Sequence, residues 1–152
     1  MSKEGTVSPK RPLAESLRPQ SLDDFIGQSH FRQRLRTLMQ SKDLPSLLLF
    51  GPPGCGKSTV ALLLAKHSGK SFVRVSAPDV GITALRKQIQ EKEILILDEL
   101  HRYSKVQQDF FLPLLETGEL TLIATTTENP SFSVTRQLLS RLHVLRLRSL
   151  GM

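Results

Sequence analysis

Residues 47–58 read Leu-Leu-Leu-Phe-Gly-Pro-Pro-Gly-Cys-Gly-Lys-Ser, and they carry the strongest indication of the fold. The first four residues form a short apolar run of the kind found in a fully buried strand. Residues 51–58 then fit the pattern G-x-x-x-x-G-K-[ST] at every defined position. An Ala/Leu-rich segment follows over residues 57–66 and ends at Ser68-Gly69, which predicts a helix. A strand, a glycine-rich loop and a helix in this order indicate a loop that binds phosphate groups.

Each residue type in this loop has a physical task. The glycines let backbone N–H groups turn inward around phosphate oxygens, and the helix that begins at Lys57 directs its positive dipole end at the same anion. Lys57 is expected to reach the β- and γ-phosphates, and the Ser58 hydroxyl to coordinate Mg²⁺. The alternative is a chance glycine-rich turn between a strand and a helix. The residues predicted to contact the nucleotide here are Gly51, Pro52, Pro53, Gly54, Cys55, Gly56, Lys57, Ser58 and Thr59.

Apolar runs and helical periodicity alternate along the rest of the chain. Further strands are predicted at 72–75, 94–97, 120–124 and 144–147, and further helices at 30–40, 81–91, 106–115 and 135–142. In the helix at 106–115, Pro113 is expected to reshape the last turn. The alternation predicts an α/β fold with a five-stranded, mostly parallel sheet flanked by helices. Residues 13–150 are expected to form one nucleotide-binding core domain, preceded by a flexible basic tail at residues 1–12.

A second acidic motif follows the apolar run at 94–97. Asp98 and Glu99 come directly after it, 41 positions beyond Lys57. The carboxyl ends of parallel strands face the crevice where open α/β sheets bind ligands. Asp98 is therefore predicted to hold Mg²⁺ together with Ser58, and Glu99 to act as the general base that activates water. The alternative is a strand end capped by two solvated acids.

The amino-acid composition excludes several classes of protein. The chain has 152 residues, of which 39% are hydrophobic and 23% charged, which argues against wholesale disorder. Its single cysteine, Cys55, excludes a disulfide framework and is interpreted as filler in the loop. No stretch approaches the roughly 20 apolar residues of a membrane span, and the first residues lack a secretory apolar run. An intracellular location without membrane contact is expected.

The net charge of +7 is divided unevenly along the chain. Residues 1–46 hold eight Lys/Arg and five Asp/Glu, residues 47–130 hold nine of each, and residues 131–152 hold four Arg and no acid. The two flanks are therefore basic and the centre is neutral. A polyanionic partner and a simple solvated surface both remain open as explanations.

Taken together, these motifs resemble those of AAA+ ATPases, and among them the replication-associated recombination protein A group, which includes the maintenance-of-genome-stability and Werner-helicase-interacting proteins. The most specific stretch of the resemblance is Thr-Thr-Glu-Asn-Pro-Ser-Phe at residues 126–132. The matching segments are residues 11–15 with 17–19 and 25–28, residues 51–58, residues 98–102 with 107–109 and 112–114, and residues 126–132 with 139–141. Members of this group continue into a helical lid after the fifth strand, so this chain is expected to be a P-loop NTPase core without that lid.

The resemblance implies further roles for individual residues. Thr126 corresponds to the polar sensor at the end of the fourth strand, and Arg141 to the arginine finger that reaches a neighbouring subunit's γ-phosphate. Arg18, Pro19 and Ile26 correspond to the segment that packs against adenine. The resemblance also implies ATP and Mg²⁺ as cofactors and a homo-oligomer. Expected partners are single-stranded, forked or broken DNA and replication or helicase proteins, in the nucleus of a eukaryote or the cytoplasm of a bacterium.

Three functions follow from these expectations. The leading hypothesis is a Mg²⁺-dependent ATPase that acts in replication fork maintenance, recombination and repair. The rival hypothesis is a catalytically incompetent, nucleotide-binding interaction module that modulates full-length oligomers. A lesser alternative is an AAA+ ATPase of the clamp-loader or branch-migration type, which would share the general motifs but not the stretch at 126–132.

Overall fold

A computed structural model of the chain describes residues 29–40 and 43–148. Its centre is a single five-stranded sheet in which every pairing is parallel and the strand order is β2-β3-β4-β1-β5. The five strands are β1 (Leu47–Phe50), β2 (Phe72–Ser76), β3 (Ile94–Asp98), β4 (Thr121–Thr126) and β5 (His143–Arg146). The predicted α/β fold with a mostly parallel sheet is therefore confirmed, whereas the predicted tail at 1–12 lies outside the described residues.

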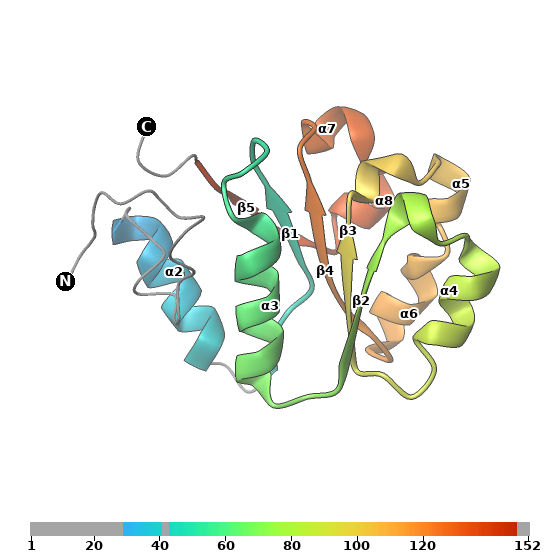
Figure 1. The fold of residues 1–152 in the computed structure, drawn as a ribbon, viewed down its shortest axis with the longest axis horizontal. Helices are drawn as coiled ribbons and strands as arrows, with labels where there is room; N and C mark the ends of the chain where they lie inside the picture. Colours follow the sequence, from blue (N-terminus) through green and yellow to red (C-terminus); the bar gives the residue numbers. More distant parts are fainter. Residues whose placement is uncertain (1–28, 41–42, 149–152) are drawn as a thin grey trace.

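Helices cover both faces of the sheet (Figure 1). One face carries α2 (Ser29–Gln40) and α3 (Lys57–Ser68), and the other carries α4 (Ile82–Gln88), α6 (Phe111–Thr117) and α8 (Arg136–Leu139). The remaining short elements are α5 (Lys105–Gln108), α7 (Pro130–Ser133), and the 3₁₀ turns η2 (Ala77–Asp79) and η3 (Leu100–Arg102). The expectation of flanking helices is thus confirmed as well.

Two apolar cores lie on the two faces of the sheet. Side chains alternate between faces along a strand, so Ile94 and Ile96 of β3 pack under α3 while Leu95 and Leu97 pack under α4 and α6. Burial on both faces explains why the inner strands β1, β3 and β4 are mostly apolar in the sequence, whereas the edge strands β2 and β5 are more exposed. The same alternation decides which polar residues at the strand ends face α3.

The predicted helix at 106–115 is wrong in one respect, because the chain forms two helices there. The break falls at Asp109 and Phe110, between α5 and α6. Pro113 is the third residue of α6, in the first helical turn, where its missing N–H leaves no hydrogen bond unmade. Proline is therefore placed where a helix begins and does not reshape the last turn. The short helix α7 was not predicted.

Gln108 ties the segment after β3 to the segment after β4. Its side-chain nitrogen donates to the carbonyls of Tyr103 and Ser133 at 3.1 and 2.9 Å, and its side-chain oxygen accepts from the Thr135 N–H at 2.9 Å. The residue is only 1% exposed. Because these partners are backbone groups, Gln108 positions α7 and α8 relative to α5 without depending on other side chains.

Replacing Gln108 with alanine is expected to lower the free energy of unfolding by about 2–4 kcal/mol, since it leaves several buried backbone groups without a partner. Urea unfolding of the purified chain measures this loss. Gln88→Ala, on the exposed side of α4, is the matched control and should change stability by less than about 0.5 kcal/mol. Equal losses for the two variants would contradict the assigned role of Gln108.

Candidate functional site

The loop between β1 and α3 lies at the carboxyl edge of the sheet, where β1 ends at Phe50 (Figure 1). Gly51 must lack a side chain because a Cβ there would lie 2.6 Å from the Leu147 carbonyl oxygen. Gly56 has a φ of 93° and directly precedes α3, a left-handed conformation that favours glycine. The tip of the loop, residues 52–54, is exposed. The predicted glycines thus serve a close backbone approach and a tight entry into the helix.

Lys57 is the first residue of α3, and its ammonium group lies inside the loop. Its Nζ donates to the carbonyl oxygens of Gly51 and Pro52, both at 2.9 Å, and the residue is 8% exposed. A buried ammonium group and the amino end of a twelve-residue helix converge on the same loop. Both features favour an anion, so this arrangement fits a phosphate group. Thr59, the last residue of the predicted set, is half-buried in the first turn of the same helix.

Cys55 is buried beneath the loop, with its Sγ 3.9 Å from Lys57 Nζ. Burial raises the pKa of the Cys55 thiol, and this effect outweighs the opposing influence of the Lys57 ammonium group. The neutral thiol is a poor nucleophile. This environment supports the interpretation of Cys55 as a packing residue of the loop.

The two predicted motifs meet at Ser58 and Asp98. Ser58 Oγ donates to Asp98 Oδ1 at 2.9 Å, although the residues are 40 positions apart. Among the described residues, no group of three or more His, Cys, Asp or Glu is arranged to hold a metal ion. A hydroxyl and a carboxylate alone are the donor set of a Mg²⁺ that takes its other ligands from water and substrate phosphates. Ser58 and Asp98 therefore fit Mg²⁺, which would offset the negative charge of bound phosphate oxygens.

Glu99 follows β3 in an unusual backbone conformation. Its φ is 59° and its ψ 49°, in the left-handed region that non-glycine residues seldom adopt. Its N–H donates to Thr125 Oγ1 at 3.3 Å, and the residue is exposed. The turn therefore separates the two adjacent acids, because Asp98 is buried in the sheet and Glu99 faces solvent. Strain of about 1–3 kcal/mol at such a residue is typical of functional sites.

The two threonines that end β4 have different partners. Thr125 Oγ1 donates to Asp98 Oδ1 at 3.0 Å, on the face covered by α3. Thr126, the predicted sensor, lies on the opposite face, and its hydroxyl is 2.9 Å from His101 Nδ1. Its Oγ1 also accepts from the Glu128 N–H at 3.2 Å. Thr126 is thus placed beside the turn that carries Glu99, whereas Thr125 contacts Asp98 directly.

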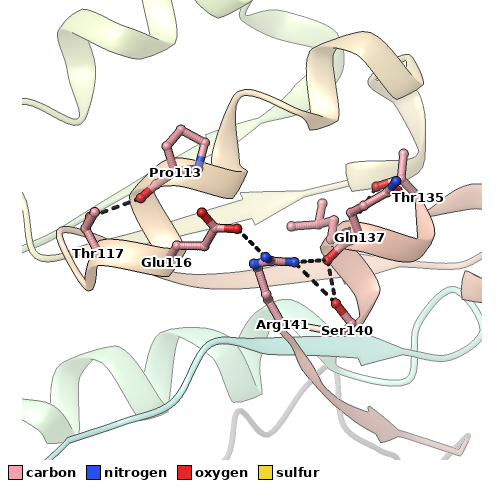
Figure 2. A network of polar contacts seen from close by, with 8 residues as sticks. Pro113, Glu116, Thr117, Thr135, Gln137, Ser140 and Arg141 are labelled. Carbon is pink, nitrogen blue, oxygen red and sulfur yellow. Dashed lines mark hydrogen bonds and ion pairs between the residues drawn. The ribbon is translucent and has the colours of Figure 1, made fainter.

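Arg141 lies away from the phosphate loop, in a separate polar network (Figure 2). The guanidinium group forms an ion pair with Glu116 of α6 and donates to the Gln137 carbonyl at 2.8 Å and to Ser140 Oγ at 3.4 Å. None of the contacts found among the described residues joins Arg141 to residues 51–58. Arg18, Pro19 and Ile26, the predicted adenine contacts, lie outside the described residues.

The sequence did not single out Thr125 or Arg74 as site residues. Thr125 is one of three consecutive threonines, which suit any strand end, so the sequence does not distinguish it from its neighbours. Arg74 donates to Asp98 from the neighbouring strand. Its only sequence signal is a charge inside an otherwise apolar strand run, at a position that shares a face with Asp98 once the register of β2 and β3 is known.

A parallel sheet with this loop, the lysine buried in it and the paired serine and aspartate define a P-loop nucleotide-binding domain of the AAA+ class. Residues 17–143 match the family described as the Holliday junction DNA helicase RuvB P-loop domain, and the chain belongs to this family. No helix within 29–40 or 43–148 combines the length and apolar character needed to cross a bilayer.

Two curated relatives extend this assignment. The chain is 42% identical over 151 residues to the ATPase WRNIP1 of Dictyostelium discoideum, a match that covers 91% of this chain and 17% of that protein. It is 40% identical over 153 residues to replication-associated recombination protein A of Escherichia coli K12, covering 93% of this chain and 34% of that protein. The predicted resemblance to this group is therefore confirmed. The chain spans about a third or less of the length of these two relatives.

The fold is also that of a solved structure. The RuvB of Thermotoga maritima, described as a Holliday junction branch migration motor, superposes with a TM-score of 0.74 at 30% sequence identity. The match covers 86% of this chain and 48% of that one. The shared part is thus the P-loop domain, in agreement with the family match.

Proposed function

We propose that the chain binds ATP with Mg²⁺ and hydrolyses it, and that this activity serves replication-associated recombination and repair. The observation that carries the proposal is the hydrogen bond from Ser58 to Asp98. It brings the phosphate loop and the acidic strand end into one site, as a nucleotide with its metal requires. The names of the relatives support the cellular role.

In this proposal the residues of the loop hold the substrate. The loop backbone and Lys57 bind the β- and γ-phosphates, and Ser58 and Asp98 bind Mg²⁺. Glu99 accepts a proton from water while the water oxygen bonds to the γ-phosphorus and the bond to the β,γ-bridging oxygen breaks. The products are ADP and inorganic phosphate. The exposure of Glu99 and the strained turn that separates it from Asp98 support its role as general base.

The remaining predicted residues act around this centre. Thr126 orients the water or the γ-phosphate, and its contact with His101 beside the Glu99 turn supports this role. Arg141 reaches the γ-phosphate of a neighbouring copy, which makes the active form a homo-oligomer. Arg18, Pro19 and Ile26 contact the adenine.

The proposed partners are inferred from the names of the relatives and from exposed arginines of this chain. The names of the relatives associate them with recombination, replication and Holliday junction branch migration, so forked, single-stranded or broken DNA is the proposed polyanion. Arg146 and Arg148 are exposed at the edge of the sheet and would contact phosphates in a salt-dependent way. A helicase or replication protein is a further proposed partner, with the nucleus or a bacterial cytoplasm as the location.

Lys57→Ala tests nucleotide binding. At a concentration 100-fold above its dissociation constant, a non-hydrolysable ATP analogue with Mg²⁺ should stabilise the wild type by about 2.7 kcal/mol, roughly 5–10 °C in melting temperature. Loss of a buried ammonium group that pairs with phosphate weakens binding by about 30-fold or more. At the same analogue concentration, the rise in melting temperature should fall to about a third or less in the variant.

Lys66→Ala provides the control, because Lys66 is an exposed lysine of the same helix. The Lys66→Ala variant should keep the full rise in melting temperature on addition of the ATP analogue. The same full rise in the Lys57→Ala variant would refute the assigned site. Normal binding by the wild type with no release of phosphate, with or without forked DNA, would favour the rival function of a nucleotide-binding interaction module.

A further inference from the structure

The carboxylate of Asp98 has a third donor in addition to the two hydroxyl groups. Oδ1 accepts from Ser58 at 2.9 Å and from Thr125 at 3.0 Å, while Oδ2 accepts from Arg74 Nε at 2.8 Å. Asp98 is only 9% exposed, and the Arg74 guanidinium is its salt-bridge partner. A buried carboxylate at the nucleotide site is therefore neutralised by a protein cation.

The register of the sheet explains why Arg74 reaches this carboxylate. In the parallel pair of β2 and β3, Arg74 lies opposite Ile96, and Ser76 lies opposite Asp98. Residues two apart on a strand share a face, so Arg74 points to the face that α3 covers, as Phe72 does. The long arginine side chain then spans the diagonal to Asp98 and remains 47% exposed.

The ion pair between Arg74 and Asp98 affects the binding of a triphosphate, because ATP carries several negative charges that an unneutralised carboxylate would repel. Asp98 lies at the same edge of the sheet as the phosphate loop and contacts Ser58 directly. At an effective dielectric constant near 20, the interaction of two unit charges roughly 6 Å apart changes a binding constant about 100-fold. Since Arg74 is half-exposed, solvent screening reduces the expected effect to about 10-fold.

We propose that Arg74 is a positioning residue that neutralises Asp98, so that the triphosphate binds before the divalent cation does. This inference rests on the proposed function, because it assumes that the loop binds ATP. When Mg²⁺ is present, the cation itself supplies the positive charge beside Asp98, and Arg74 contributes little to affinity. Arg74 thus affects how strongly ATP binding depends on the metal.

The test measures the dissociation constant of ATP by calorimetry, once in EDTA and once in excess MgCl₂. In Arg74→Gln, we expect the dissociation constant in EDTA to rise about 10-fold and the one in MgCl₂ to change by less than about 3-fold. The ratio of the two constants therefore increases. A merely structural role of Arg74 would weaken binding equally in both conditions and leave the ratio unchanged.

Three further variants serve as controls for the effect of Arg74→Gln on the ratio of the two dissociation constants. Arg74→Lys keeps the charge and should keep the wild-type ratio. Combining Arg74→Gln with Asp98→Asn removes both charges and should restore ATP binding in EDTA. Lys92→Gln removes an exposed positive charge before β3, at the opposite edge of the sheet, and should have no effect.

Two outcomes would overturn the inference, and they can be told apart. An unchanged ratio in Arg74→Gln, with normal ATP binding by the wild type, refutes the role of Arg74 and leaves the proposed function standing. A wild type that binds no ATP in MgCl₂ refutes the proposed function and this inference together.

Discussion

Replacing Arg141 with alanine is expected to lower ATP turnover about 1,000-fold or more, the range for an arginine finger that stabilises charge during phosphoryl transfer. Binding of ATP to the same chain should be unchanged, because Arg141 lies in the network of Glu116 and Gln137, away from its own phosphate loop. Phosphate release and ATP affinity, measured on the same preparation, check both statements.

The contacts that Arg141 makes within its own chain are compatible with a role as an arginine finger. An exposed ion pair such as the one with Glu116 (Figure 2) contributes about 0–1 kcal/mol. A charge-assisted, bidentate contact between arginine and phosphate is stronger, so the γ-phosphate of a neighbouring copy can displace Glu116. The ion pair therefore orients the guanidinium in the free chain without locking it.

Mixing two inactive variants tests whether the finger acts in trans. Arg141→Ala retains an intact phosphate loop, and Lys57→Ala retains an intact finger. At an interface between them, one complete site forms, so the mixture should recover a measurable part of the wild-type rate. Arg136→Ala is the control, because Arg136 is an exposed arginine of α8, the short helix that precedes Arg141; this variant should be active alone. A mixture that stays inactive while Arg141→Ala retains full ATP binding would contradict a trans role.

Replacing Glu99 with glutamine is expected to reduce the turnover number about 100- to 10,000-fold, the contribution of a positioned general base. Glutamine has the same shape and cannot accept the proton from water. The affinity for ATP should remain within about 3-fold of the wild type, since Lys57 and Ser58 are untouched. Single-turnover hydrolysis measured beside equilibrium binding separates the two effects.

Glu91 provides a matched control for this prediction. It is also an exposed glutamate with a left-handed backbone, at φ 63°, but it precedes β3 and so lies at the opposite edge of the sheet. Replacing either glutamate with glycine should relieve backbone strain and raise the free energy of unfolding by up to about 1 kcal/mol. Only the changes at Glu99 should abolish hydrolysis, and equal loss of activity on changing Glu91 would contradict the assignment.

The strand, the glycine-rich loop, the helix start and the acidic strand end of the candidate site could be predicted from local sequence, because each of them is a continuous stretch of the chain. Residues 47–58 contain a strand, a loop and a helix start in order, and Asp98-Glu99 directly follows an apolar run. Each of these motifs can be recognised from adjacent residues alone, without knowledge of the tertiary structure. The parallel sheet followed from the alternation of strands and helices, and the structure confirms it.

Contacts that depend on strand register or on helix packing could not be predicted from the sequence. The pairing of Arg74 with Asp98 depends on the register between β2 and β3, and the pairing of Arg141 with Glu116 depends on how α8 packs beside α6. The division of 106–115 into two helices follows from Pro113, which breaks a helix in its interior but is tolerated in a first turn. Sequence alone does not tell these two positions apart.

The most direct test of the nucleotide site is a calorimetric titration of the purified chain with ATP in excess MgCl₂. We expect saturable binding of one ATP per chain, because one phosphate loop, one Lys57 and one pair of Ser58 and Asp98 form the site. The same titration of Lys57→Ala should show at least about 30-fold weaker binding. Absence of saturable binding to the wild type would contradict the account.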